Sequence, residues 1–204
     1  MPNFSHRRPV HKKTAAVVIT GGSSGIGKCF IGRICKLKRE ILVCNISRTK
    51  PEINDAGVRL FHFPVDLSKS EDIGLALEAV RNKIESEAGE GEILLINNSG
   101  FGAYGDFQSI GRAVHRDMIA VNVAAAVEGT ELLLPLLLER GGAIVNIAST
   151  AAFQPTPQLA TYGATKAFLR NWSLALNEDL RGTRVRSLCV CPGPTATNFF
   201  KAAG

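Results

Sequence analysis

The strongest constraint on the fold is an alternation of short apolar runs with longer helical patterns along the chain. The apolar runs occupy residues 15–20, 41–46, 58–63, 93–97, 143–148 and 185–191, and they are rich in Val, Ile and Leu. Most of them lack a polar residue at every second position, as expected for strands that are buried on both faces of a parallel sheet. The alternation therefore predicts an α/β fold with a doubly wound parallel sheet and helices on both faces.

The composition predicts one domain. A chain of 204 residues with 45% hydrophobic and 21% charged residues is long enough for one packed core and too ordinary to be disordered or fibrous. No apolar run approaches the ~20 residues that span a bilayer, so we expect no membrane span. The N-terminus imitates a signal peptide, but its apolar part is only about six residues long and runs into a glycine-rich turn. We expect a basic tail over residues 1–13 and a single domain over residues 14–204.

The net charge of +6 is concentrated in that tail. Arg7, Arg8, Lys12 and Lys13 hold four of the 24 basic residues, which leaves 20 basic residues against 18 acidic ones elsewhere. A basic arm can contact phosphates, but no aromatic residues interleave this one and no nucleic-acid fold signature follows it. We therefore expect no nucleic-acid partner.

The cysteines bear on the compartment and on metals. The five of them are odd in number and lie mostly in apolar stretches, which favours reduced thiols in a cytoplasmic protein. No pair has the spacing of a zinc site, and the four histidines are scattered, so we expect no metal.

The first apolar run leads directly into TGGSSGIGK, residues 20–28. Glycines allow a sharp turn or a close approach to a ligand, and a helix that begins there directs free amide groups at an anion. The spacing of Gly21, Gly25 and Gly27 is neither G-x-G-x-x-G nor the loop of nucleotide hydrolases. The segment predicts a phosphate cradle, with a purely geometric strand-to-helix turn as the alternative.

The end of the second apolar run indicates which dinucleotide is bound. Ser47 lies 20 residues after Gly27, where enzymes that prefer NAD carry an acid, and Arg48 and Lys50 follow it. A guanidinium can hold a phosphate through paired hydrogen bonds, so Arg48 predicts NADP(H) as cofactor. The alternative for Arg48 is an exposed loop arginine.

Five blocks of the chain, taken together, resemble the short-chain dehydrogenases/reductases. They are TGGSSGIG at 20–27, VDL at 65–67, NNSG at 97–100, the set Asn122, Ser149, Tyr162 and Lys166, and PGPTAT at 192–197. The resemblance covers the chain from about Ala15 and is strongest to a bacterial branch with distant likeness to acyl and steroid ketoreductases. It implies a Rossmann fold and hydride transfer between a nicotinamide and a carbonyl or alcohol.

The resemblance also implies a catalytic set. Tyr162 and Lys166 lie four residues apart in a helical stretch and therefore share a face. Tyr162 is the expected proton donor and acceptor, and the Lys166 ammonium with an oxidised nicotinamide should draw the phenol pKa toward neutrality. Ser149, at the end of an apolar run, should orient the substrate carbonyl. Asn122 should help to position a water that relays protons through Lys166; its alternative is a satisfied core asparagine.

The remaining motif residues are expected to contact the cofactor. Asp66 resembles the acid that bonds the adenine amino group, residues 98–100 should pass over the nicotinamide-side ribose, and the PGPTAT segment should wrap the nicotinamide amide. The full expected set is Gly21, Ser23, Ser24, Gly25, Ile26, Gly27, Ser47, Arg48, Asp66, Leu67, Asn98, Ser99, Gly100, Tyr162, Lys166, Pro192, Gly193, Thr195 and Thr197. Separately, Ser68 and Glu71 predict a capping box before a helix.

The chain departs from the family pattern at its end. The family continues past this last motif with a substrate loop, a helix and a seventh strand, whereas the sequence stops at Gly204. Either the protein is truncated or it continues beyond these residues. The second is favoured, because residues 185–191 would otherwise form an apolar edge strand. Phe101, Tyr104 and Phe153 remain as expected apolar walls for a hydrophobic or acyl carbonyl substrate.

Three functions stay open from the sequence. The first is an NADP(H)-dependent carbonyl reductase or alcohol dehydrogenase, which the resemblance also implies to be a homodimer or homotetramer. The second is a cofactor-binding sensor or scaffold without chemistry, against which the complete catalytic set argues. The third is a nucleic-acid binder that uses the basic arm.

Overall fold

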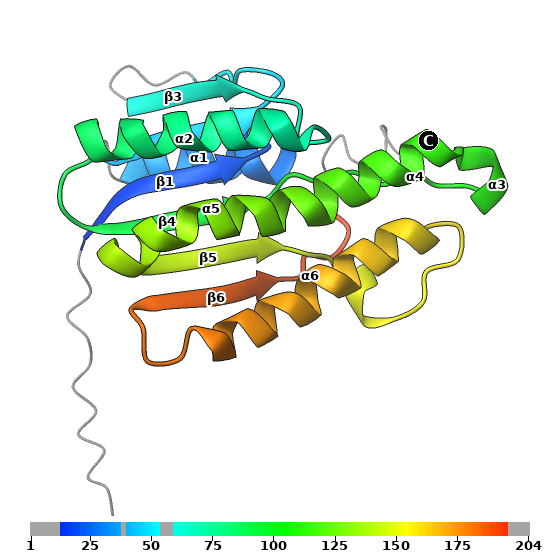
Figure 1. Cartoon of the computed structure of the whole chain (residues 1–204). Helices are drawn as coiled ribbons and strands as arrows, with labels where there is room; N and C mark the ends of the chain where they lie inside the picture. The colour runs from blue at the N-terminus through cyan, green and yellow to red at the C-terminus, as the bar shows by residue number, and fades with distance from the viewer. Residues whose placement is uncertain (1–12, 38–39, 54–58, 196–204) are drawn as a thin grey trace, which may run out of the picture.

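The strands form one parallel sheet, and the direction in which successive strands are added reverses between the two central strands. A computed structural model describes residues 13–37, 40–53 and 59–195. The strands are β1 (Thr14–Thr20), β2 (Leu42–Ser47), β3 (Arg59–Pro64), β4 (Glu92–Asn97), β5 (Gly142–Ile147) and β6 (Val185–Val190). Their order is β3-β2-β1-β4-β5-β6, and every pair is parallel. All six predicted strands are confirmed, and so is the doubly wound sheet (Figure 1).

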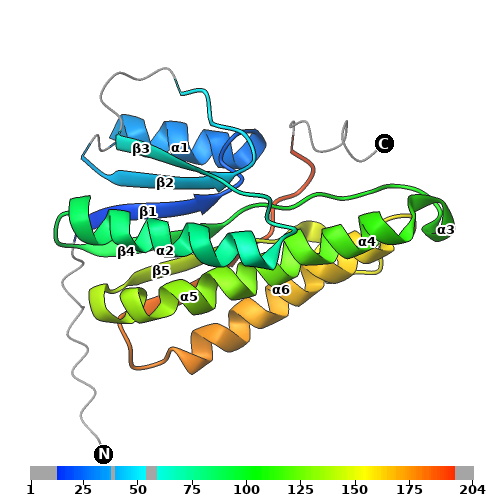
Figure 2. The ribbon, with the colours of Figure 1, turned by 45° about the horizontal axis from the view of Figure 1, so that its top comes forward.

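Helices cover both faces of the sheet, as predicted. They are α1 (Gly25–Leu37), α2 (Ser70–Glu87), α3 (Phe107–Ile110), α4 (Arg112–Ile119), α5 (Ala125–Arg140) and α6 (Ala160–Asp179), with a π-helical turn η1 (Ala120–Ala124) and a 3₁₀ turn η2 (Thr150–Phe153). Figures 1 and 2 show α1 on one face and α2, α5 and α6 on the other. A ligand crevice is expected where such a sheet reverses its strand order, outside the carboxyl ends of the strands.

The two faces bury separate apolar clusters because side chains alternate along each strand. Val17, Ile19 and Val43 pack with Ile31 of α1 in one cluster. Val18 and Leu42 belong to the other cluster, with apolar side chains from α2 and α5. Both faces of the central strands are therefore apolar, which is why the sequence showed continuous runs rather than alternation.

One helix of the structure bears on the expectation of no membrane span. The segment Arg112–Arg140 is a continuous run of 29 helical residues, and it is long and apolar enough to cross a membrane by length and composition. The sequence reading overlooked it because the apolar residues are interrupted. In the structure, α5 packs on α2, β4 and β5 through residues such as Leu133 and Leu137, so core packing accounts for the apolar character.

The predicted capping box at the start of α2 is wrong. The residue that precedes the helix is Lys69, and no side chain caps the first turn. The Ser68 hydroxyl instead donates to Asp66 Oδ1 at 2.9 Å, and the Ser68 amide donates to the same oxygen at 3.0 Å. The Ser68 hydroxyl bonds the Asp66 carboxylate rather than an amide of the first helical turn, because the bonds to Asp66 close a local turn just before the helix.

Candidate active site

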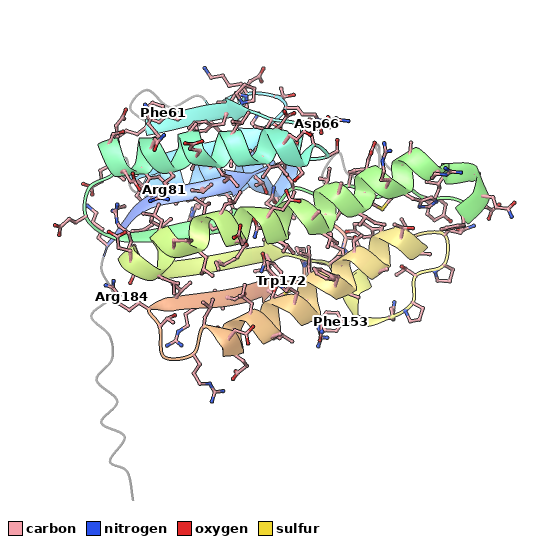
Figure 3. The ribbon with its side chains drawn as sticks, in the orientation of Figure 1. Phe61, Asp66, Arg81, Phe153, Trp172 and Arg184 are labelled. Atoms are coloured by element: carbon pink, nitrogen blue, oxygen red, sulfur yellow. The ribbon has the colours of Figure 1, made fainter. Side chains whose placement is uncertain are left out.

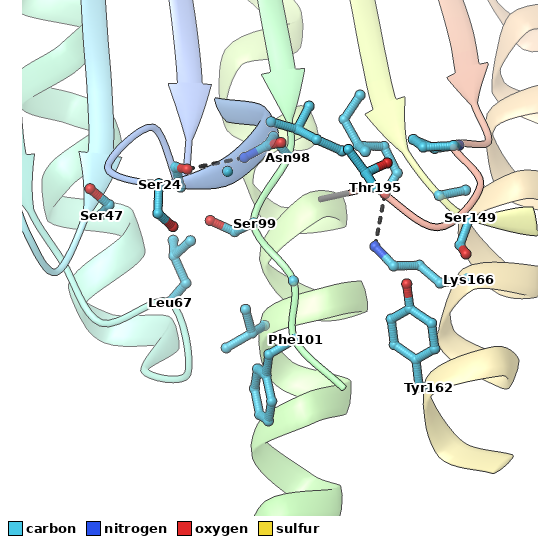
Figure 4. Close-up of a pocket in the computed structure, with 18 of the residues that line it drawn as sticks. Ser24, Ser47, Leu67, Asn98, Ser99, Phe101, Ser149, Tyr162, Lys166 and Thr195 are labelled. Carbon is cyan, nitrogen blue, oxygen red and sulfur yellow. Dashed lines mark hydrogen bonds between the residues drawn. The ribbon is translucent and has the colours of Figure 1, made fainter. Parts of the chain in front are cut away.

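A cavity of about 660 Å³ lies at the carboxyl ends of the strands and collects nearly all the predicted site residues. Of the predicted set, Gly27 and Asn122 do not line it, and Thr197 lies outside the described residues. The cavity is also lined by Thr49, Val65, Ser68, Phe101, Asp117, Val121, Ile147, Ala148, Thr150, Ala151, Leu159 and Pro194, which were not in that set. Figure 4 shows Ser24, Ser47 and Ser99 toward one side and Ser149, Tyr162 and Lys166 toward the other.

The glycine turn between β1 and α1 has no room for side chains. Gly21 has a φ of +69°, and a Cβ there would lie 2.6 Å from Ser99 Oγ. A Cβ on Gly27 would lie 2.3 Å from the Gly21 carbonyl oxygen and 2.6 Å from Asn98 Nδ2. The Asn98 amide also donates to the carbonyls of Thr20 and Gly21, at 2.9 and 3.1 Å. The turn is thus packed against the loop after β4, beside the first amides of α1.

Thr20 is a site residue that the sequence reading missed. Its hydroxyl oxygen accepts the backbone N–H groups of Asn98 and Ser99, each at 3.0 Å, and so joins the ends of β1 and β4. The available signal was a hydroxyl residue that ends an apolar run directly before a glycine. Asn45 was missed as well, because it lies inside an apolar run.

Arg48 and Asp66 line the same end of the cavity as the glycine turn. The two hydrogen bonds from Ser68 lower the pKa of the Asp66 carboxyl, and the Arg48 guanidinium adds to that effect. Figure 3 shows Asp66 where the chain leaves β3 for α2. Arg48 is exposed, and its predicted contact with a phosphate stays a prediction.

Tyr162 and Lys166 project from α6 into the other end of the cavity. Tyr162 is 9% exposed and Lys166 is 4% exposed, and the Lys166 Nζ lies 5.8 Å from the centre of the phenol ring. Lys166 donates a hydrogen bond to the Ile147 carbonyl at 2.8 Å. Ser149 begins the turn that follows β5, where its Oγ accepts the Ala151 N–H at 3.1 Å. The Ser149 hydroxyl faces the Tyr162 phenol closely enough to lower the phenol pKa by hydrogen bonding.

The chain's own groups do not lower the Tyr162 pKa, and the lowering expected beside an oxidised nicotinamide stays a prediction. Burial raises the pKa of the phenol, and the hydrogen bond with Ser149 only opposes that rise. Burial also lowers the pKa of Lys166 to about 8, while the Cys189 and Cys191 thiols oppose that change. Spacing in the sequence gave the shared helical face but not the burial, which here disfavours the charged form of both groups.

Asn122 is fully buried behind the cavity wall, in the π-helical turn. Its Nδ2 donates to the Phe101 carbonyl at 2.9 Å and to Thr165 Oγ1 at 3.0 Å, and its Oδ1 accepts the Phe101 N–H at 3.0 Å. Both amide protons are therefore used by protein partners. Only the oxygen has a lone pair left for the predicted water, and that role stays a prediction.

Two of the three expected apolar walls are not part of the cavity. Phe101 lines it, but Tyr104 is 54% exposed and hydrogen-bonds Gln158, and Phe153 is 61% exposed. The Phe153 ring lies 4.5 Å from the Arg170 guanidinium, beside α6 (Figure 3). Side-chain direction in loops is not encoded by residue type, so their aromatic character was misleading. Val121 and Leu159 line the cavity in their place.

Comparison with known proteins assigns the family. The family model described as short chain dehydrogenase matches residues 15–204. The chain belongs to the short-chain dehydrogenase family. It is 32% identical over 185 residues to the ketoacyl reductase HetN of Nostoc sp., covering 87% of this chain and 62% of HetN. It is 33% identical over 191 residues to the uncharacterized oxidoreductase YvrD of Bacillus subtilis, covering 91% of this chain and 70% of YvrD.

Solved structures of other short-chain dehydrogenases agree with this assignment. The structure of a short-chain dehydrogenase from Sphingobium yanoikuyae in complex with NADPH has a TM-score of 0.80 and 30% identity, covering 93% of this chain and 74% of that one. The 3-ketoacyl-(acyl-carrier-protein) reductase from Brucella melitensis complexed with NADH has a TM-score of 0.77 and 26% identity, covering 91% and 78%. This short-chain dehydrogenase chain therefore spans only part of the length of its relatives.

Proposed function

We propose that the chain is the cofactor-binding and catalytic part of an NADP(H)-dependent oxidoreductase that interconverts a carbonyl compound and its alcohol. The observation that carries the proposal is the convergence of Ser149, Tyr162 and Lys166 at one end of a cavity whose other end holds the glycine turn and Arg48. A dinucleotide needs both ends, one for its phosphates and one for its reactive ring.

The residues present fit such a cofactor. The backbone of the glycine turn is bare where side chains at Gly21 and Gly27 would collide with Ser99 and the turn itself. The first amides of α1 face the cavity there and would hold the pyrophosphate. Asp66 and Arg48 would hold the adenosine half, and residues 98–100 with Lys166 the nicotinamide half. When bound, the nicotinamide supplies or accepts the hydride.

The proton chemistry is assigned to this chain's own side chains. In reduction, the Tyr162 hydroxyl donates its proton to the substrate carbonyl oxygen, and in oxidation it takes the proton back. The Ser149 hydroxyl lines the cavity beside the Tyr162 phenol and orients that oxygen by donating a hydrogen bond to it. Protonated Lys166 stabilises negative charge on the Tyr162 phenol oxygen. Because burial lowers the pKa of Lys166 to about 8, the protonation of Lys166 changes near pH 8.

NADP(H) is the cofactor that the charge pattern favours. Relatives have been solved with NADPH and with NADH, so likeness alone leaves the choice open. Arg48 borders the cavity immediately after β2, and no acid lies within Ser47–Lys50 to bind a ribose hydroxyl pair. A guanidinium at that position suits a 2′-phosphate.

The substrate end of the cavity suits an apolar carbonyl compound. Phe101, Val121, Leu159 and Ala151 supply apolar surface to the cavity that Tyr162 also lines. We also propose self-association into a homodimer or homotetramer, with the exposed apolar residues of α5 and α6, such as Leu132 and Phe168, as the contact surface.

The test is a parallel titration of the protein with NADPH and NADH, followed by reduction assays on a panel of ketones and aldehydes. We expect preferential NADPH binding and carbonyl-dependent NADPH oxidation. Tyr162→Phe should lower turnover by about 10²–10⁴-fold and leave the NADPH Kd unchanged, because only the transferable proton is lost. Tyr162→Phe protein that turns over at the wild-type rate would overturn the catalytic assignment. Binding of neither nucleotide would overturn the cofactor assignment.

A further inference from the structure

Asn45 occupies an unusual place for an amide side chain. It lies inside β2, opposite Ile19 of β1 and His62 of β3, and it is fully buried. A buried polar group at such a position destabilises the fold unless it is hydrogen-bonded, so its partners indicate why it is there. It does not line the cavity, and none of the motifs above includes it.

Every hydrogen-bonding group of the Asn45 amide has a protein partner. Its Oδ1 accepts the backbone N–H of Gly22 at 2.8 Å. Its Nδ2 donates to Ser47 Oγ at 2.8 Å and is 3.0 Å from His62 Nδ1. Because the Gly22 N–H can only donate, the amide orientation is fixed, and His62 Nδ1 must then be the acceptor.

Two of these partners belong to the two halves of the cofactor cradle. Gly22 lies between Gly21 and Ser23, which both line the cavity at the phosphate end. Ser47 lines it at the adenosine end, and its hydroxyl donates to the Thr49 carbonyl at 2.8 Å. That bond closes a turn whose central residue is Arg48. The Ser47 proton is thus already used, which leaves the recognition of a 2′-phosphate to Arg48.

Gly22 is matched to Asn45 by space as well as by the hydrogen bond. A Cβ at Gly22 would lie 2.3 Å from Asn45 Oδ1 and 2.3 Å from Ile31 Cδ1. Ile31 is fully buried in the cluster beneath α1, and the Asn45 amide is held by three partners, so a Cβ at position 22 would press on both. The missing side chain at position 22 is therefore what lets the amide reach the loop backbone.

We propose that Asn45 is a positioning residue for the cofactor, one that sets the Gly22 turn and the Ser47–Thr49 turn at a fixed separation and thereby sets the affinity for NADP(H). This inference rests on the proposed function. Asn45 touches no cofactor atom in this scheme. It acts through the Gly22 amide on the phosphate side and through Ser47 on the Arg48 side.

The first test is Asn45→Ala, with NADPH and NADH dissociation constants measured by fluorescence and the Tm measured beside them. We expect the NADPH Kd to rise at least about tenfold in protein that is still folded at the assay temperature. The matched control is Asn177→Ala. The Asn177 Oδ1 accepts the Ser187 N–H at 3.1 Å, and neither residue lines the cavity. It should lower the Tm and leave the NADPH Kd unchanged.

The second test compares Gly22→Ala alone with Gly22→Ala combined with Asn45→Ala. The single Gly22→Ala variant still tests the proposal if Asn45→Ala does not fold. Alone, Gly22→Ala should weaken NADPH binding because its Cβ displaces the Asn45 amide. In the Asn45→Ala background only the contact with Ile31 remains, so the same change should weaken NADPH binding less, and the two effects should combine to less than their sum. Additive effects, or an unchanged NADPH Kd in folded Asn45→Ala, would overturn the positioning role. Wild-type protein that binds neither nucleotide would instead refute the proposed function.

Discussion

Asn122 and Phe101 are joined by two hydrogen bonds that run in opposite directions between one side chain and one backbone. The Asn122 Nδ2 donates to the Phe101 carbonyl at 2.9 Å, and the Phe101 N–H donates to Asn122 Oδ1 at 3.0 Å. The π-helical turn Ala120–Ala124 holds the Asn122 amide against the backbone of Phe101. Such turns are frequent at functional sites. The pair fixes the course of the loop after β4, where Gly100 passes between Asn122 and Lys166.

Replacing Asn122 with Ala should therefore damage both stability and turnover. The Phe101 amide and carbonyl lose their partners, which should cost about 1–3 kcal/mol in the free energy of unfolding measured by urea. Displacement of the loop should lower kcat by at least about tenfold, because small shifts of reacting groups are costly. Thr165→Val keeps both bonds between Asn122 and Phe101 but removes the Thr165 bonds to the Asn122 amide and the Tyr162 carbonyl, and it is the milder comparison. An Asn122→Ala protein with wild-type kcat would show that the loop holds its course without the amide.

Arg48→Ala should separate the two nucleotides. Loss of a charged hydrogen-bonding partner of the 2′-phosphate costs about 1.5–3 kcal/mol, so the NADPH Kd should rise about ten- to a hundredfold while the NADH Kd stays unchanged. Lys50→Ala is the matched control, because Lys50 is also exposed and basic but does not line the cavity. Equal losses for both nucleotides would mean that Arg48 supports the fold of the turn rather than the choice of cofactor.

The pKa of Lys166 predicts a stability difference that depends on pH. An unfolded lysine has a pKa of about 10.4, whereas burial lowers that of folded Lys166 to about 8. Between these values the unfolded chain binds more protons, so this residue's contribution to stability rises with pH. The free energy of unfolding of wild type, relative to Lys166→Met, should be constant below pH 8 and rise from pH 8 to about pH 10. Urea unfolding at several pH values measures it, and a flat difference would contradict the lowered pKa.

The strands and the cavity at their carboxyl ends could be predicted because both depend on patterns that are visible in the sequence alone. Continuous apolar runs mark strands with two buried faces, and glycines mark a turn that no side chain can enter. Asn45 and Thr20 escaped prediction because each is a polar residue at the end of, or within, an apolar run. Their partners, Gly22 and Asn98, come from other segments of the chain and are found only after the sheet is assembled.

The errors about the site also have one physical origin. Tyr104 and Phe153 were expected in the cavity on residue type, but loop geometry turns them to solvent. Burial, which spacing does not show, raises the Tyr162 pKa in the chain by itself, so the expected fall depends on the charge of an oxidised nicotinamide. Direction and burial of a side chain depend on the whole fold, whereas residue type and spacing do not.

A comparison of two glycines in α1 tests how tightly the cradle is packed. Gly27→Ala puts a Cβ 2.3 Å from the Gly21 carbonyl oxygen and 2.6 Å from Asn98 Nδ2, so the turn or the loop after β4 must move. Overpacking of this kind costs about 1–3 kcal/mol, and the displaced turn should weaken NADPH binding at least about tenfold. Gly32→Ala is its control on the same helix, because a Cβ there meets no atom within 4 Å.

The control should move stability in the opposite direction. Alanine is favoured over glycine in a helix interior by about 0.5–1 kcal/mol, so Gly32→Ala should raise the Tm and leave the NADPH Kd unchanged. The two substitutions are chemically identical and lie in one helix, so only the space around them differs. Thermal unfolding and NADPH titration of both variants measure that difference. Wild-type NADPH affinity in Gly27→Ala would mean that the cradle does not depend on close contact between the glycine turn and the loop after β4.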